Sequence, residues 1–127
     1  MHIMLIDDDR DNMAELSNFL QALGHSCNQF ANAYKALENY RINHYDLVIT
    51  DLIMPHLDGI EVLKMILQAK PEAIIVVVTA FTNPKIMAGI IKQGAYTVLA
   101  KPLNINRFID TMETIALQSG IRQTNLP

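Results

Sequence analysis

The stretch from residue 45 to residue 59, YDLVITDLIMPHLDG, decides how the rest of the chain is interpreted. Its apolar run LVI at 47–49 leads to Asp51, and a proline and the turn pair DG at 58–59 precede a helical pattern. This order predicts a buried strand that ends in a carboxylate, followed by a loop into a helix. Ligands of open parallel sheets bind beyond the carboxyl ends of the strands, which makes Asp51 a candidate site residue. Taken alone, the pattern fits a solvated turn aspartate equally well.

Apolar runs of this kind recur along the chain, and each is followed by a helical pattern. They predict further strands at 2–6, 26–30, 73–78 and 96–100, of which 26–30 is polar enough for a sheet edge. The run at 73–78, AIIVVV, is expected to be a central strand buried on both faces. Five strands that alternate with five helices predict a parallel sheet with helices on both faces. Right-handed crossovers then favour a doubly wound α/β fold with the flavodoxin-like strand order 2-1-3-4-5.

Polar residues and prolines indicate where the helices begin. Asp11 or Asn12 is expected to cap the first helix, and Asp9 is also interpreted as a helix-capping acid. Asn32 and Asn104 are expected to cap the second and the fifth helix. Pro84 suits the first turn of the fourth helix. Helical spacing predicts that the fifth helix faces the core with Ile105, Phe108, Ile109, Met112 and Ile115.

The composition argues against several classes of protein. The 127 residues, 50% of them apolar, suit one domain, which we expect at 1–118, with 119–127 as a tail or the start of a linker. A net charge of -3 without a basic stripe argues against direct nucleic-acid binding. No apolar stretch is long enough to span a membrane. Acidic residues lie too close to the N-terminus for a signal peptide, so a soluble cytoplasmic domain is expected. The single cysteine, Cys27, permits no internal disulfide and is interpreted as core filler.

Charged and hydroxyl side chains stand at the carboxyl ends of the inner predicted strands: Asp7 and Asp8, Asp51, Thr79 and Lys101. Because the carboxyl ends of parallel strands meet at one edge of the sheet, we expect these side chains to converge. Clustered carboxylates repel one another, and an all-oxygen ligand set selects a hard cation such as Mg²⁺. Lys101 and Thr79 would bind a phosphate beside the metal. Since no glycine-rich loop holds a nucleotide, the phosphoryl group is expected on a carboxylate of the protein itself.

These residues resemble the receiver domain of two-component response regulators, and the resemblance covers nearly the whole chain. The matching pieces are DD at 7–8, DLIMPHLDG at 51–59, TA at 79–80 and KP at 101–102. Each piece is weak alone, but four of them in this order at four strand ends are specific. The resemblance implies a phosphorylation-dependent signalling switch, in which a partner histidine kinase or phosphotransfer protein loads Asp51 with a phosphoryl group. It implies no enzyme activity beyond self-phosphorylation and autodephosphorylation.

The resemblance also assigns the ligands of the metal and of the phosphoryl group. The implied Mg²⁺ ligands are Asp8 and Asp51 directly, Asp7 largely through water, and the backbone carbonyl of Ile53. The implied phosphoryl ligands are the Thr79 hydroxyl, the backbone amide of Ala80 and the Lys101 ammonium. The bond between Lys101 and Pro102 is expected to be cis. His44 and His56 lie in predicted loops without partners at ligand spacing, so we interpret them as surface residues.

Three positions depart from what the receiver family usually carries. Three residues before the lysine, Val98 replaces the aromatic ring that swings inward when the family switches. Tyr96 lies two residues earlier and is expected on the same strand face. Ile53 and Phe81 border the path of the water that attacks the aspartyl phosphate, and neither can orient that water. A long-lived phosphoryl group is therefore expected.

Other functions fit the residues less well. A degenerate receiver that acts as a phosphorylation-independent adaptor would not need every charged site residue. A phosphatase with an aspartyl nucleophile usually needs a second acid two residues later, where this chain has Ile53. A flavodoxin-like cofactor carrier would need a Ser, Thr and Gly-rich loop after the first strand, where this chain has three acids.

The face formed by the fourth helix, the fifth strand and the fifth helix is the expected partner surface. The same face could join two copies of the chain in a homodimer. On the fourth helix we expect Met87 and Ile91 to face the core. Ile86 and Ile90 would extend the apolar arc onto the surface, which is typical of an interaction site.

Overall fold

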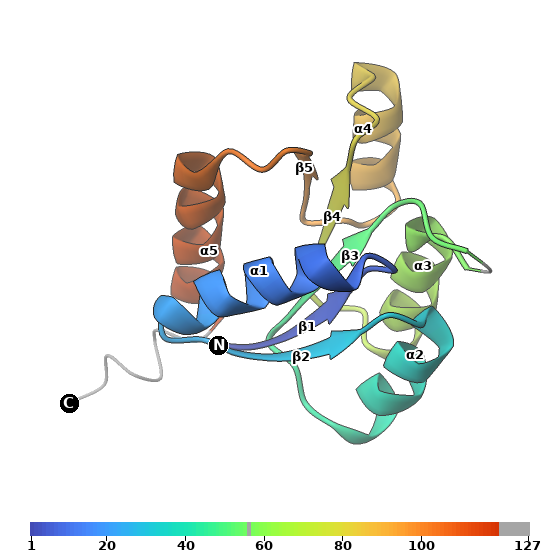
Figure 1. The fold of residues 1–127 in the computed structure, drawn as a ribbon. Coiled ribbons are helices and arrows are strands. Elements are labelled where there is room, and N and C mark those ends of the chain that lie inside the picture. The colour runs from blue at the N-terminus through green and yellow to red at the C-terminus, as the bar shows by residue number, and fades with distance from the viewer. Residues whose placement is uncertain (56, 120–127) are drawn as a thin grey trace.

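A computed structural model describes residues 1–55 and 57–119 of the chain. Within them five strands alternate with five helices (Figure 1): β1 (His2–Ile6), α1 (Arg10–Ala22), β2 (Ser26–Phe30), α2 (Ala33–Ile42), β3 (Leu47–Asp51), α3 (Gly59–Ala69), β4 (Ile75–Thr79), α4 (Pro84–Lys92), β5 (Thr97–Ala100) and α5 (Ile105–Ser119). None of these helices is long and apolar enough to cross a membrane. The expectations for His56 and for the tail beyond Ser119 lie outside the described residues.

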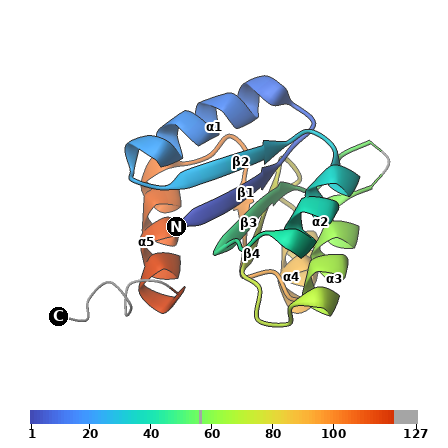
Figure 2. The same cartoon turned by 90° about the horizontal axis from the view of Figure 1, so that it is seen from below.

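The strands form one parallel sheet in the order β2-β1-β3-β4-β5, which confirms the predicted topology. Helices α1 and α5 cover one face, and α2, α3 and α4 cover the other (Figure 2). Asp51 lies opposite Val78, and Thr79 lies opposite Ala100. This register brings the carboxyl ends of β3, β4 and β5 to one edge of the sheet.

Alternation of side chains along each strand separates the core into two layers. In β1, Met4 and Ile6 pack with α2 and α3, whereas Ile3 and Leu5 pack with α1 and α5. All five residues of β4 are buried, as predicted for a central strand with helices on both sides. In the edge strand β2, Cys27 is half-buried and packs against the α1/α5 layer, in agreement with its interpretation as core filler.

The prediction that Tyr96 and Val98 share a strand face was wrong. Tyr96 packs in the layer of α1 and α5, whereas Val98 packs in the layer of α2, α3 and α4. The alternation rule does not apply, because β5 begins at Thr97 and Tyr96 still belongs to the preceding loop. Its amide donates to the carbonyl of Ile75 at 2.8 Å, at the start of β4.

The first helix is capped by Asp9, which confirms its interpretation as a capping acid, and not by Asp11 or Asn12. The carboxylate of Asp9 accepts both of their amide protons, each at 3.1 Å, and both residues lie inside α1. The predicted caps of α2 and α5 are confirmed, since Asn32 and Asn104 accept backbone protons of those helices. Pro84 is the first residue of α4, as predicted.

The prediction of which α4 residues face the core was wrong by one residue. Ile90 is buried at 3% exposure, and Met87 packs partly against the same layer, whereas Ile91 is 46% exposed. One residue rotates the helix by about 100°, so a short apolar pattern did not fix which isoleucine docks on the sheet. Ile86 is 46% exposed, as predicted, and Ile105 of α5 is 50% exposed rather than inward.

Candidate functional site

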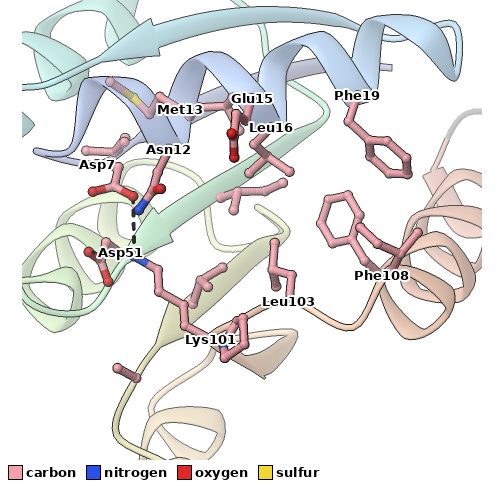
Figure 3. Close-up of a pocket in the computed structure, with 17 residues that line it drawn as sticks. Asp7, Asn12, Met13, Glu15, Leu16, Phe19, Asp51, Lys101, Leu103 and Phe108 are labelled. Carbon is pink, nitrogen blue, oxygen red and sulfur yellow. Dashed lines mark hydrogen bonds and ion pairs between the residues drawn. The ribbon is translucent and has the colours of Figure 1, made fainter.

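Three charged side chains from distant parts of the sequence meet at the carboxyl edge of the sheet (Figure 3). The Nζ atom of Lys101 lies 3.1 Å from Oδ2 of Asp51 and 3.4 Å from Oδ2 of Asp7. Partial burial by itself would lower the pKa of Lys101, but the hydrogen bond and charge of Asp51, with those of Asp7, raise it above its usual value. The lysine therefore stays protonated and offsets part of the negative charge at this edge.

Three carboxylates gather around this lysine. Asp7, Asp8 and Asp51 each place an oxygen within 4.8 Å of the others. Asp8 is exposed, whereas the side chains of Asp7 and Asp51 are each 13% exposed. A cation would relieve the repulsion among them, and a set of oxygen donors without nitrogen or sulfur fits a hard ion such as Mg²⁺.

Backbone amides fix the orientation of the two half-buried carboxylates. Oδ1 of Asp51 accepts the amide proton of Leu52 at 2.9 Å, and Oδ1 of Asp7 accepts that of Asp9 at 2.9 Å. Each of these carboxylates therefore has one oxygen held by its own loop and one oxygen directed at Lys101.

Gly59, at the start of α3, lies against the end of β3. Its amide donates to the carbonyl of Leu52 at 2.8 Å. A Cβ atom at residue 59 would collide with the carbonyl oxygen of Asp51 and lie 2.9 Å from Cα of Leu52. Since these are backbone atoms, they cannot rotate away as a side chain would. The close approach explains why glycine stands here, and it ties the position of α3 to that of Asp51.

Thr79 links the ends of β4 and β5. Its side chain is buried, its Oγ1 accepts the amide proton of Phe81 at 2.9 Å, and its carbonyl accepts that of Lys101 at 2.8 Å. The bond between Lys101 and Pro102 is cis, as expected. Thr79 follows the register partner of Asp51, but its hydroxyl is engaged with Phe81 rather than with the carboxylates.

Apolar residues border the charged edge. Ala80 lines the same cavity as Asp51 and Lys101. Ile53 and Phe81, in the loops after β3 and β4, are 57% and 54% exposed. Both side chains are therefore accessible to solvent in the loops that follow Asp51 and Thr79.

Sequence reasoning missed two features of this site. The hydrogen bond from Phe81 to Thr79 and the contact between Gly59 and Asp51 depend on loop geometry, for which the DG turn was the sole signal. The surface position of His44 is confirmed: its side chain is 70% exposed, and its Nε2 lies 3.2 Å from Asp46.

A family model described as the response regulator receiver domain matches residues 3–113. The chain belongs to this family. The C4-dicarboxylate transport transcriptional regulatory protein DctD of Rhizobium meliloti (strain 1021) is 31% identical over 109 residues, which cover 86% of this chain and 24% of that protein. This receiver domain therefore spans about a quarter of the length of the curated relatives it matches.

Solved receiver domains share its fold. The crystal structure of the response regulator TrrA from Thermotoga maritima, in complex with Mg²⁺ and beryllofluoride, has a TM-score of 0.82 and 26% identity and covers 90% of this chain and 97% of that one. The solution structure of the beryllofluoride-activated NtrC4 receiver domain dimer has a TM-score of 0.85 and 24% identity over 90% of this chain and 94% of that one. These structures agree with the strand order and the helix arrangement described above.

Proposed function

We propose that this receiver domain is a phosphorylation-dependent switch in which Asp51 accepts a phosphoryl group from a phosphohistidine of a partner kinase or phosphotransfer protein. The observation that carries the proposal is the bridge from Lys101 to Asp51 and Asp7 inside a cluster of three carboxylates. Asp51 is the carboxylate that lies at the centre of this edge, because β3 is the middle strand of the sheet.

Each neighbour of Asp51 has a role in the proposed transfer. A carboxylate oxygen of Asp51 attacks phosphorus, and the bond from phosphorus to the histidine nitrogen breaks. Lys101 exchanges part of its contact with the carboxylates for a phosphoryl oxygen, while the Thr79 hydroxyl and the Ala80 amide bind the others. Thr79 must turn toward the phosphoryl group for this, which affects its hydrogen bond to Phe81.

The proposed metal ion is Mg²⁺, held by Asp8 and Asp51, by Asp7 largely through water, and by the backbone carbonyl of Ile53. Bound there, it would offset the charge that develops on the phosphoryl oxygens. The cluster of three carboxylates supports this assignment. The receiver structure of TrrA, which has the same fold, was solved with Mg²⁺ and beryllofluoride, and this is consistent with such a site.

The proposed output is an interaction rather than a reaction catalysed on a substrate. We place the receiver unit at 1–118 in the cytoplasm and interpret residues 119–127 as a tail or the start of a linker. The exposed apolar side chains of Ile91 on α4 and Ile105 on α5 favour a homodimer through the face formed by α4, β5 and α5. The activated NtrC4 receiver domain was solved as a dimer, which is consistent with self-association of this domain. Sedimentation of the phosphorylated protein with and without Ile91→Glu tests the surface.

Two alternatives remain less favoured. A phosphorylation-independent adaptor would have no need for a lysine held between two half-buried carboxylates. An aspartyl-nucleophile phosphatase would need an acid where Ile53 presents an exposed apolar side chain.

The direct experiment measures the intact mass of the protein after treatment with acetyl phosphate and Mg²⁺. Wild type and Asp110→Asn, which alters an exposed aspartate of α5, should each gain one phosphoryl group. Asp51→Asn should gain none. A mass gain of undiminished yield in Asp51→Asn would assign the acceptor elsewhere and overturn the proposal.

A further inference from the structure

A cavity of about 620 Å³ extends from the charged edge between α1 and α5 (Figure 3). Asp51 and Lys101 lie at one end, and the rings of Phe19 and Phe108 lie at the other. Leu16 and other apolar side chains line the space between them. The acid cluster is thus the polar end of a longer, mostly apolar compartment.

The size and the lining of this cavity match those of small-molecule sites. Pockets for such ligands measure roughly 300–1,000 Å³ and combine apolar walls with a few polar groups at defined positions. Here the sheet contributes Ile49 and Val78, and α5 contributes Phe108, whose ring centroid lies 6.1 Å from that of Phe19. Both helices and the sheet bound the space, so its occupant must be small.

The polar end favours a cation over an anion. It carries the carboxylates of Asp7, Glu15 and Asp51, and Lys101 is the one basic residue among those that line the cavity. The ammonium of that lysine is already shared between two of the carboxylates, so it leaves a net negative end. Figure 3 shows Glu15 on α1 directed toward the cavity, between the acid cluster and the apolar part.

We propose that this cavity binds a small amphiphile with a protonated amine and an apolar tail. The amine lies among Asp7, Glu15 and Asp51, and the tail lies between Leu16 and Leu103 and reaches toward the two phenylalanine rings. Amine binding itself requires neither a metal nor a phosphoryl group. The amine opposes Mg²⁺ because both use the same carboxylates, and this second part rests on the metal site proposed above.

The test is an NMR titration of the methyl-labelled protein with n-alkylamines from butylamine to octylamine, without Mg²⁺. Affinity should rise about fourfold for each added methylene, as expected for transfer of a CH₂ group from water to an apolar site. The largest shifts should fall on Leu16 and Leu103. n-Octanol and octanoate should bind more weakly than octylamine. Equal affinities for the three head groups, or shifts centred on Ile53 and Ile86 in the groove beside α4, would overturn the proposal.

Matched variants locate the two ends of the ligand. Glu15→Gln should weaken octylamine about two- to fivefold, as expected for loss of one partly exposed ion pair, whereas Glu38→Gln on α2 should not. Leu103→Trp should block the tail, whereas Ile42→Trp, at a residue that is 81% exposed, should not. If Leu103→Trp lowers the melting temperature so far that it cannot be used, the comparison of head groups and the Glu15→Gln variant still test the proposed binding pose.

Competition with Mg²⁺ separates this inference from the proposed phosphorylation. Saturating Mg²⁺ should lower the apparent affinity for octylamine, and Asp8→Asn should reduce that competition. Where calorimetry shows that Mg²⁺ binds and that Asp8→Asn weakens it, unchanged octylamine affinity in Mg²⁺ would place the amine away from the acid cluster and overturn the proposed pose. None of these measurements detects phosphorylation. The proposed phosphorylation of Asp51 can therefore be refuted while amine binding is confirmed, or the reverse.

Discussion

Two aspartates stand at opposite ends of β3, and their surroundings differ. Before the strand, Asp46 accepts the amide proton of His2 at 2.7 Å with Oδ2, and its Oδ1 lies 3.2 Å from the ring of His44. At the end of the strand, Asp51 shares Lys101 with Asp7 in a group of three carboxylates. Asp46 has matched donors and joins β1 to the start of β3. Asp51 stands among like charges.

The difference shows that hydrogen-bond donors match the aspartate at the start of the strand, whereas carboxylates crowd together at its end. Partial burial alone would raise the pKa of Asp46, but hydrogen bonds from His2 and His44 outweigh it and lower that pKa. An ionised Asp46 therefore stabilises the fold. Like charges at the other end destabilise the fold unless a cation or Lys101 offsets them, as is common at functional sites.

The largest expected effect concerns the lifetime of a phosphoryl group on Asp51. Ile53 and Phe81 cannot hydrogen-bond an attacking water, and loss of orientation of a nucleophile costs on the order of 10²-fold in rate. After removal of the donor, the double variant Ile53→Asn with Phe81→Glu should lose phosphate on the order of 10²-fold faster than wild type. Phosphate decay in Asp46→Asn, at the other end of β3, should match wild type. A double variant that decays no faster would refute the water-exclusion argument.

Mg²⁺ affinity is the next largest effect. Asp8→Asn should weaken Mg²⁺ binding at least about tenfold, since loss even of a group that orients a metal ligand costs that much. Asp46→Asn should bind Mg²⁺ as wild type does. Isothermal titration calorimetry of both variants checks this, and equal affinities in Asp8→Asn and wild type would mean that the acid cluster is not the metal site.

Lys101→Ala separates loading from response. The variant keeps Asp51 and the carboxylates, so it should still accept some phosphate from acetyl phosphate. Without the ammonium, the phosphoryl group loses its contact with β5, and amide exchange in α4 should change little on phosphorylation. Hydrogen–deuterium exchange of α4, normalised to the phosphorylated fraction, measures this. A wild-type exchange response in Lys101→Ala would contradict the proposed role.

Stability should show the smallest effect, with opposite signs at the two ends. Without Mg²⁺, Asp46→Asn should lose about 1 kcal/mol of unfolding free energy, whereas Asp8→Asn should gain a few tenths of a kcal/mol as repulsion falls. Because the folded-state pKa of Asp46 is lowered, its contribution is complete above about pH 4 and is lost as the pH falls through the folded value. Urea unfolding from pH 7 to pH 3 should therefore bring Asp46→Asn and wild type together at low pH. A constant difference would assign the effect to packing.

The sheet and the convergence of the charged residues could be predicted because they depend on order along the chain. Each strand is short and apolar, and parallel pairing then places every carboxyl end at one edge, whatever the loops do. Asp7, Asp51 and Lys101 meet for this reason although up to 94 residues separate them.

Features that depend on a shift of one residue could not be predicted. Asp9, Asp11 and Asn12 were all candidates for capping α1, and the structure selects Asp9; on α4, Ile90 rather than Ile91 docks on the sheet. In both cases neighbouring residues have similar chemistry, so the sequence pattern fits more than one choice of residue. Tertiary packing determines which residue caps the helix or docks on the sheet. The cavity between α1 and α5 is a stronger case, since it depends on how far apart the two helices lie. The sequence shows the apolar residues that line it but not the space between them.

Gly59 has a consequence for how genetic variation at this site would be interpreted. It has no functional group, yet any other residue there would push against the main chain of Asp51. A Gly59→Ala protein should have a displaced Asp51, and, if Asp51 is the acceptor as proposed, its defect should appear in the rate of phosphate uptake. In a deep mutational scan scored by signalling, residue 59 should therefore group with the charged residues of the site, although inspection of side chains alone would classify it as a neutral position at the start of α3.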